Sequence, residues 1–150
     1  MTDDAVSTSL APLLLAIDHV GIAVPSLEAA VDFHCSVFGL VVKHREINEE
    51  QGVAEAMLAA PDSDHGAARI QLLAPLSPES SIATFIGRSG PGLQQLAYRV
   101  TDVAAAADVL RSAGVRMLYE QSRRGTAGSL INFAHPKDTG GVLIELVQHA

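Results

Sequence analysis

The sequence is poor in cysteine and in basic residues, and each shortage excludes a class of protein. Its one cysteine, Cys35, can form no internal disulfide and lacks the neighbours of a thiolate metal site, which fits a reducing cytoplasm. Lysine and arginine number 10 against 17 acidic residues, for a formal charge of −7, and no basic run is long enough to follow a phosphate backbone. Nucleic acids and anionic membrane surfaces are therefore not expected partners.

The sequence also lacks an apolar run long enough to span a membrane. Residues 10–17 are apolar, but Asp3 and Asp4 make the preceding segment acidic where a secretory signal needs basic residues. We therefore predict a flexible N-terminal arm over residues 1–14 and a single domain over residues 15–150. With 48% apolar residues, a chain of this length can fill one core.

What the sequence does contain is an internal duplication. Residues 95–102 align with residues 19–26, and residues 144–147 align with residues 70–73. A long period that occurs only twice indicates a duplicated module and not a solenoid.

Periodicity predicts the same order of elements in both modules, a strand, a helix and three more strands. In module one, at about residues 15–76, these are residues 17–24, 26–39, 40–46, 53–59 and 68–74, and we expect the helix to have Ser26 as its N-cap and to end at Gly39. In module two, at about residues 92–150, they are residues 93–100, 102–114, 115–119, 130–134 and 142–148, with a loop over residues 120–128. A short helix over residues 80–86 and a Gly-Pro-Gly linker connect the modules. The fold class is therefore α+β, with two tandem βαβββ modules forming a curved mixed sheet.

The duplication aligns one polar side chain in the first strand of each module and one in the last. These residues are His19 and Gln71 in module one, and Gln95 and Glu145 in module two. If the first and last strands of a module are neighbours, the four polar groups converge on the concave side of a curved sheet. The pattern predicts a site built from one imidazole, two carboxamides and one carboxylate.

Five stretches give the sequence a specific resemblance to a known family. They are residues 17–25 (IDHVGIAVP), 48–55 (NEEQGVAE), 70–73 (IQLL), 131–138 (INFAHPKD) and 141–146 (GVLIEL). With these stretches the chain resembles the methylmalonyl-CoA epimerases of the vicinal oxygen chelate, or glyoxalase-like, superfamily, from about residue 17 to residue 148. The resemblance implies paired βαβββ modules around an open cavity and a divalent metal ion.

The resemblance also implies roles for single residues. By position, the metal ligands fall on His19, Gln71, Gln95 and Glu145, and the acid/base pair falls on Glu55 and Glu145. Where epimerases of this family carry a His-His pair, this chain has Gln94-Gln95. A carboxamide oxygen is a harder and weaker donor than an imidazole nitrogen, so the site is expected to favour Mn²⁺ or Mg²⁺ over Co²⁺ or Zn²⁺. Alternatively, Gln71 and Gln95 act as neutral hydrogen-bond donors in the place of the metal.

An acyl-CoA or other small carboxylic substrate needs local positive charge in this acidic chain, and Arg124 and Lys137 are the candidates. Ser129 is expected to bind the carboxylate of the substrate, by resemblance. Members of the superfamily commonly pair, so a homodimer is expected. The single cysteine indicates the cytoplasm as its location.

Two carboxylates suit the inversion of a carbon that lies between a thioester and a carboxylate, because the proton leaves one face and returns on the other. A Lewis-acid metal or aimed amide donors can stabilise the enolate that develops. We predict an isomerase that epimerises a 2-alkylmalonyl-CoA, with methylmalonyl-CoA as the first choice. Two alternatives remain open: a diverged relative that isomerises, cyclises or decarboxylates another β-carbonyl acid, and a non-catalytic protein that binds a small molecule.

Overall fold

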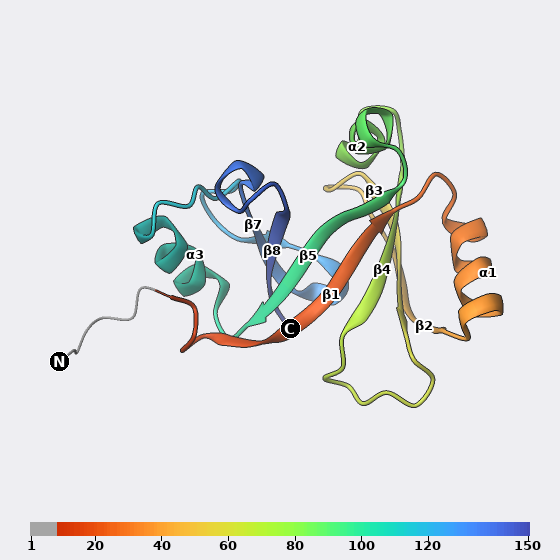
Figure 1. Ribbon diagram of the computed structural model, residues 1–150, viewed down its shortest axis with the longest axis horizontal. Helices are drawn as coiled ribbons and strands as arrows, with labels where there is room; N and C mark the ends of the chain where they lie inside the picture. Colours follow the sequence, from red (N-terminus) through yellow and green to blue (C-terminus); the bar gives the residue numbers. More distant parts are fainter. Residues whose placement is uncertain (1–8) are drawn as a thin grey trace. The chain divides into compact units, whose positions relative to one another are not determined.

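The computed structural model describes residues 9–150. They divide into two compact units, one of residues 18–95 and one of residues 96–150 together with the described residues up to Ile17. In chain order the elements are β1 (Leu14–Ala23), α1 (Leu27–Phe38), β2 (Val41–Asn48), β3 (Val53–Ala59), β4 (Arg69–Pro75), α2 (Ser81–Ser89), β5 (Gly92–Val100), α3 (Val103–Ser112), β6 (Arg123–Arg124), β7 (Leu130–Ala134) and β8 (Leu143–Gln148) (Figure 1). Within the described residues, no helix has the length and apolarity needed to cross a membrane.

The predicted N-terminal arm falls partly outside the described residues, because residues 1–8 are not among them. Leu10 and Leu13 pack against the core of the 96–150 unit. The carbonyl of Leu13 accepts a hydrogen bond from the Thr101 N–H at 2.9 Å, and β1 begins at Leu14. Apolar and backbone contacts therefore hold the end of this segment.

The 18–95 unit is built on four strands in the order β2-β3-β4-β1. The strand β1 runs parallel to β4, while β2, β3 and β4 are antiparallel neighbours. The helix α1 lies between β1 and β2 in the chain. This order of strand, helix and three strands confirms the prediction for module one.

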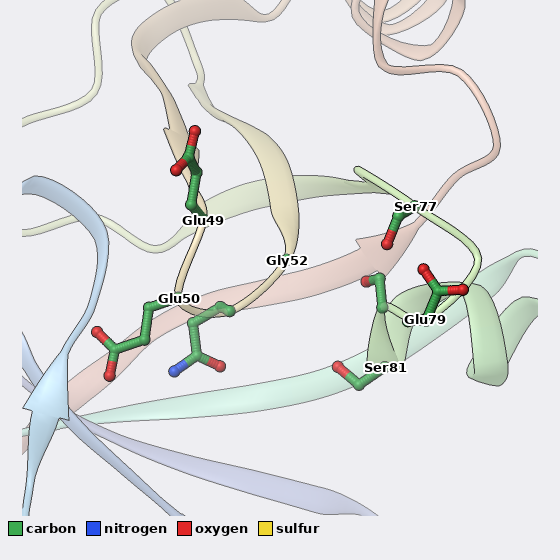
Figure 2. A pocket seen from close by; sticks show the side chains of 8 residues that line it. Glu49, Glu50, Gly52, Ser77, Glu79 and Ser81 are labelled. Carbon is green, nitrogen blue, oxygen red and sulfur yellow. The ribbon is translucent and has the colours of Figure 1, made fainter.

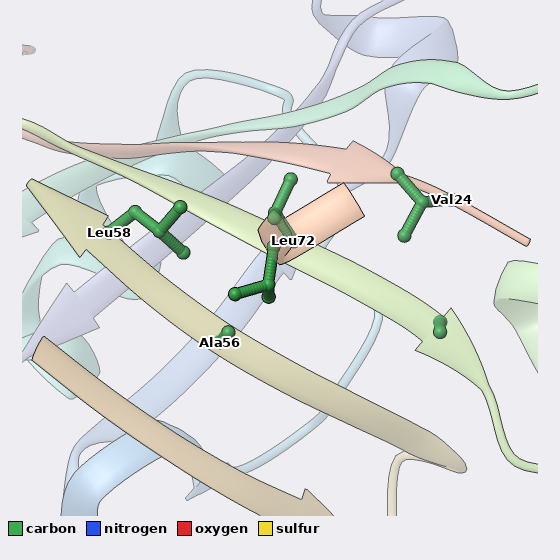
Figure 3. Packing of buried hydrophobic residues seen from close by; sticks show 6 residues of the cluster. Val24, Ala56, Leu58 and Leu72 are labelled. Carbon is green, nitrogen blue, oxygen red and sulfur yellow. The ribbon is translucent and has the colours of Figure 1, made fainter. Parts of the chain in front are cut away.

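Alternating apolar side chains fill both faces of this sheet. On the face that α1 covers, the buried cluster is Val24, Val31, Ala56, Leu58, Leu72 and Ala74 (Figure 3). On the other face, Ala23, Val53 and Leu73 pack with Ile82 of α2. Burying a side chain such as that of Leu72, which is 0% exposed, stabilises the fold by about 1.5–3 kcal/mol. The polar site residues share the second face with α2.

The caps of α1 agree with the sequence prediction. The Ser26 side chain accepts a hydrogen bond from the Ala29 N–H, so it satisfies one of the unpaired donors of the first turn. The helix ends at Gly39, whose φ of 77° lies in the left-handed region that favours glycine.

The 96–150 unit repeats the plan, with strands in the order β5-β8-β7-β6. The Asp102 side chain caps α3 by accepting from the Ala105 N–H at 3.0 Å. The buried residues Val103 and Ala106 of α3 pack with Val100 and Leu146. The α+β fold with two βαβββ modules is therefore confirmed.

One predicted strand of module two is wrong. Residues 115–119 form only a single bridge, between Met117 and Ala134, and the third strand of the module is the two-residue β6 inside the predicted loop. The ladder is interrupted by a side chain: Asn132 Oδ1 accepts from the Phe133 N–H at 2.8 Å, and in a continued ladder that N–H would pair with the Leu118 carbonyl. The same carboxamide accepts from the Tyr119 N–H at 3.2 Å and donates to the Tyr119 carbonyl at 3.0 Å.

Candidate functional site

Four predicted site residues lie in the 18–95 unit. In the parallel pair of β1 and β4, Gly21 lies opposite Gln71, and the register of β3 against β4 sets Glu55 diagonally to Gln71. Because side chains two positions apart on a strand share a face, His19 points to the same side as these residues. Gln95, near the start of β5, reaches the same face through its side chain.

These four polar side chains are buried. Their exposed fractions are 2% for His19, 2% for Glu55, 4% for Gln71 and 8% for Gln95. A polar group removed from water in this way is costly unless it has hydrogen-bond partners.

His19 is held at one ring nitrogen by its neighbour in the chain. Its Nδ1 lies 2.7 Å from Oδ2 of Asp18, which is itself only 5% exposed. An ionised carboxylate only accepts hydrogen bonds, so the proton of the neutral ring belongs on Nδ1. The other nitrogen, Nε2, then carries a lone pair and acts as an acceptor or a metal ligand.

The hydrogen bonds continue from His19 across the sheet. Gln95 Nε2 lies 3.3 Å from His19 Nε2 and 3.1 Å from Gln71 Oε1. Gln71 Nε2 in turn donates to Glu55 Oε1. We call Asp18, His19, Gln95, Gln71 and Glu55 the polar row. It is a buried row with a carboxylate at each end and neutral groups between them.

Sequence reasoning assigned no role to Asp18, although the residue stands next to His19 in the resemblance. Successive side chains on a strand normally point to opposite faces, so the alternation that places His19 in the site predicts that Asp18 points away from it. A useful signal was present in the residue types, because a carboxylate commonly orients a histidine that serves as a ligand.

The polar row offers two kinds of chemistry. Glu55 is a buried carboxylate whose position is fixed by the Gln71 amide, which suits a group that moves a proton. His19 Nε2 and the oxygens of the two carboxamides can serve as ligands of a cation. Among the described residues, no three His, Cys, Asp or Glu side chains form a group that could hold a metal ion. A cation here would therefore depend on the carboxamides.

The other predicted site residues belong to the 96–150 unit. Glu145 is 6% exposed in the middle of β8. Ser129 is 5% exposed, and its backbone closes a tight turn, since its carbonyl accepts from the Gly125 N–H at 2.9 Å. Arg124 is exposed on β6, next to Arg123, whose guanidinium lies 3.9 Å from the centre of the Tyr119 ring.

Lys137 is exposed in a short turn that an ion pair holds in place. Arg116 Nε lies 2.9 Å from Asp138 Oδ2 and Arg116 Nη2 lies 3.1 Å from Oδ1, a two-pronged contact. Hydrogen bonding to Arg116 lowers the pKa of Asp138 to about 2. The Lys137 N–H donates to His135 Nδ1 at 3.1 Å, so the backbone around this lysine is fixed.

A surface pocket of about 370 Å³ lies elsewhere in the 18–95 unit. It is lined by the turn between β2 and β3 and by the start of α2, including Glu49, Glu50 and Glu79 (Figure 2). None of the predicted site residues lines it. Its three carboxylates make it a poor place for an anionic thioester substrate.

Comparison with known proteins gives the family. The model of the glyoxalase/bleomycin resistance protein/dioxygenase superfamily matches residues 18–133. An ethylmalonyl-CoA/methylmalonyl-CoA epimerase of Cereibacter sphaeroides is 36% identical over 88% of this chain and 96% of its own.

Two solved structures are closer in sequence. The methylmalonyl-CoA epimerase of Mycobacterium tuberculosis is 54% identical, covers 97% of this chain and 93% of its own, and has a TM-score of 0.87. A methylmalonyl-CoA epimerase solved in complex with methylmalonyl-CoA and NH₄⁺ is 47% identical over 91% of this chain and 96% of its own, also with a TM-score of 0.87. The chain belongs to the glyoxalase superfamily and, within it, to the methylmalonyl-CoA epimerase family.

Proposed function

We propose that this chain is an isomerase that epimerises methylmalonyl-CoA, or a close 2-alkylmalonyl-CoA, at the carbon between the thioester and the carboxylate. The observation that carries the proposal is Glu55, a carboxylate 2% exposed, which the Gln71 amide holds within a face that also carries His19 and Gln95. The similarity to epimerases supports the substrate class, since one of them was solved with methylmalonyl-CoA.

In the proposed reaction, Glu55 as the carboxylate takes the proton from one face of the carbon, and Glu145 in its protonated form gives a proton to the other face, or the reverse. Exchange with solvent then restores both groups. Each must hold a fixed position, because proton transfer needs the carboxylate within hydrogen-bond reach of the carbon-bound hydrogen. The amide of Gln71 provides that fixation for Glu55. Exclusion of water around these buried groups strengthens their electrostatic interaction with the charge that develops on the enolate.

We further propose a divalent metal ion held by His19, Gln71, Gln95 and Glu145. Three of these donors fit such an ion, because neighbouring ligand atoms around a hard cation with bonds of about 2.1 Å are roughly 3 Å apart. The end of the Gln95 amide lies 3.1 Å from Gln71 Oε1 and 3.3 Å from His19 Nε2. When bound, the ion supplies Lewis-acid stabilisation to the enolate oxygen.

Binding of a cation and donation by Gln95 exclude each other. In the structure, Gln95 directs its Nε2 towards His19 and Gln71. To ligate a cation, this carboxamide must rotate about its last bond so that its oxygen takes the place of the nitrogen. The cost of losing two hydrogen bonds, about 1 kcal/mol each, lowers the metal affinity of this site relative to one with a second imidazole.

For substrate binding we propose Ser129, Arg124 and Lys137. Ser129 offers a buried hydroxyl in a fixed turn, and the two exposed cations suit the phosphates of the CoA portion. A homodimer in the cytoplasm completes the proposal. Light scattering of the purified chain at several concentrations tests the dimer.

Isotope exchange tests the proposed function. The purified chain is incubated with (2R)- and, separately, (2S)-methylmalonyl-CoA in deuterated water, with Co²⁺, Mn²⁺, Mg²⁺ or Zn²⁺ added in parallel. We expect deuterium at the 2-position and conversion of each epimer into the other. No exchange above the spontaneous rate with any of the ions would overturn the proposal.

The same assay separates the two alternatives. Exchange limited to other β-carbonyl acids would identify a diverged isomerase, cyclase or decarboxylase. Tight binding of an acyl-CoA without exchange, unchanged in a Glu55→Gln variant, would identify a binding protein.

A further inference from the structure

Gly21 is a glycine that the backbone of β1 does not require. It is buried in the strand between His19 and Ala23, and it is absent from the residues with positive φ. Any residue could adopt its backbone conformation, so its conformational freedom does not explain the glycine. The explanation has to come from the space around it.

That space is filled by the Gln95 side chain. A Cβ placed on Gly21 would lie 2.5 Å from Gln95 Cγ and 3.0 Å from Gln95 Cδ. It would also lie 3.2 Å from Cδ1 of Leu73, the flexible end of a side chain that can move aside. Ordinary contact begins at about 3.4 Å, so Gln95 would have to shift by roughly 1 Å.

Passed on to the amide, a shift of that size would break both contacts that the Gln95 amide makes. The amide nitrogen lies 3.3 Å from His19 Nε2 and 3.1 Å from Gln71 Oε1, and hydrogen bonds fail beyond about 3.5 Å. In its present position Gln95 therefore occupies the space that a side chain on Gly21 would need.

We propose that Gly21 is a positioning residue of the epimerase site, which acts through Gln95. Because Gly21 has no side chain, the side chain of Gln95 can lie against β1. This position places the Gln95 amide between His19 and Gln71, where it can serve as a metal ligand or a hydrogen-bond donor. The role in catalysis rests on the proposed function. The positional relationship does not, and it can be measured without substrate or metal.

The first measurement is a spectroscopic one. The ¹⁵N chemical shift of His19 Nε2 reports the hydrogen bond that this nitrogen accepts, and Gln95→Ala gives the reference value without that bond. We expect Gly21→Ala to move the His19 resonance to the Gln95→Ala value. Gly87→Ala is the matched control, because Gly87 also lacks a positive φ and a Cβ there meets nothing within 4 Å. It should leave the resonance at the parent position.

A double variant covers the case in which Gly21→Ala does not fold. Gly21→Ala combined with Gln95→Ala empties the space that the new methyl group needs, so this variant should fold and melt at the temperature of Gln95→Ala alone. A His19 resonance that stays at the parent position in Gly21→Ala would overturn the proposal. So would a double variant that fails to fold, because glycine would then serve a purpose unrelated to Gln95.

The effect on turnover is measured separately. In the exchange assay, Gly21→Ala should lower kcat by tenfold or more, which is the usual effect of losing a group that orients a ligand. The KM should stay within about twofold of the parent value. Adding Gly21→Ala to Gln95→Ala should cause no further loss. If the parent shows no exchange, the proposed function fails while the His19 resonance still decides the role of Gly21.

Discussion

The carboxylate of Asp18 lies 2.7 Å from Nδ1 of His19, although the two residues are adjacent on a strand. Both are buried, at 5% and 2% exposure. The contact fixes the tautomer of the ring and leaves Nε2 to face Gln95. Asp18, to which the sequence pattern assigned no role, thus determines which nitrogen of His19 is available as a ligand or an acceptor.

Replacing Asp18 by asparagine should weaken metal binding without unfolding the chain. An asparagine can donate to Nδ1, which favours the tautomer with its proton on Nε2 and removes the lone pair from the site. Loss of such a supporting carboxylate costs about 10–100-fold in metal affinity. Calorimetric titration with Mn²⁺ measures the affinity, and the ¹⁵N shifts of His19 report the tautomer in the absence of metal. Asp62→Asn, in an exposed loop, is the control. An unchanged tautomer in Asp18→Asn would contradict the prediction.

Glu55→Gln should separate proton exchange from inversion. If Glu55 serves one face of the carbon and Glu145 the other, the variant loses abstraction from one epimer and keeps it for the other. We expect the exchange rate for one epimer to fall by about 10²–10⁴-fold, the usual contribution of a general base. Deuterium incorporation into each epimer, followed by chiral analysis, makes the measurement. Glu79→Gln in the acidic surface pocket should behave as the parent. An equal loss for both epimers would argue against a two-base mechanism.

Gln95→His should raise the affinity for Co²⁺ and Zn²⁺. An imidazole nitrogen is a better donor to these ions than a carboxamide oxygen, and the change removes the need to rotate an amide before binding. Metal analysis after dialysis against each ion, alone and in competition with Mn²⁺, makes the comparison. Gln94→His is a suitable control, because position 94 is next to the proposed ligand and outside the polar row. If the parent already binds Zn²⁺ as tightly as the variant, the carboxamide does not weaken the site.

Much of the fold could be predicted because periodicity and capping residues agree with it. The predicted strand over residues 53–59 matches β3, and the helix between Ser26 and Gly39 has the expected caps at both ends. The wrong strand at residues 115–119 has a physical cause. Whether a strand forms there depends on the side chain of Asn132, which takes the Phe133 N–H that a continued ladder would use and also binds the backbone of Tyr119. Local sequence carries no sign of that distant competitor.

Part of the site could also be predicted from the sequence. Duplication pointed to His19, Gln71 and Gln95, and the structure brings these three together. It did not point to Gly21, because in a strand of small residues a glycine does not stand out. Its role depends on Gln95, which lies 74 positions later (95 − 21). Only the register of the strands makes that relationship visible.

Leu72→Ala should be among the more damaging apolar substitutions in the 18–95 unit. Leu72 is 0% exposed at the centre of the cluster under α1, so truncation removes buried methyl groups and leaves a cavity (Figure 3). Such changes cost about 2–5 kcal/mol in the free energy of unfolding. Urea unfolding followed by circular dichroism measures it. Ile47→Val, at a residue 65% exposed, should change the free energy by less than about 0.5 kcal/mol. A loss below 1 kcal/mol for Leu72→Ala would mean that the cluster is loosely packed.

The ion pair of Arg116 with Asp138 gives the turn around Lys137 a defined dependence on pH. Hydrogen bonding to Arg116 lowers the pKa of Asp138 to about 2, below its ordinary value of 3.8. Because the folded pKa lies below that of the unfolded chain, the pair stabilises the fold above about pH 4 and loses this effect as the pH falls towards 2. Arg116→Gln should return the pKa of Asp138 to near its ordinary value and remove this acid dependence.

Carboxyl ¹³C titration by NMR measures the pKa of Asp138. Arg45→Gln, which breaks the contact of Arg45 with Glu28 instead, should leave it at about 2. An Asp138 that titrates near 3.8 in the parent would show that the two side chains do not pair in solution.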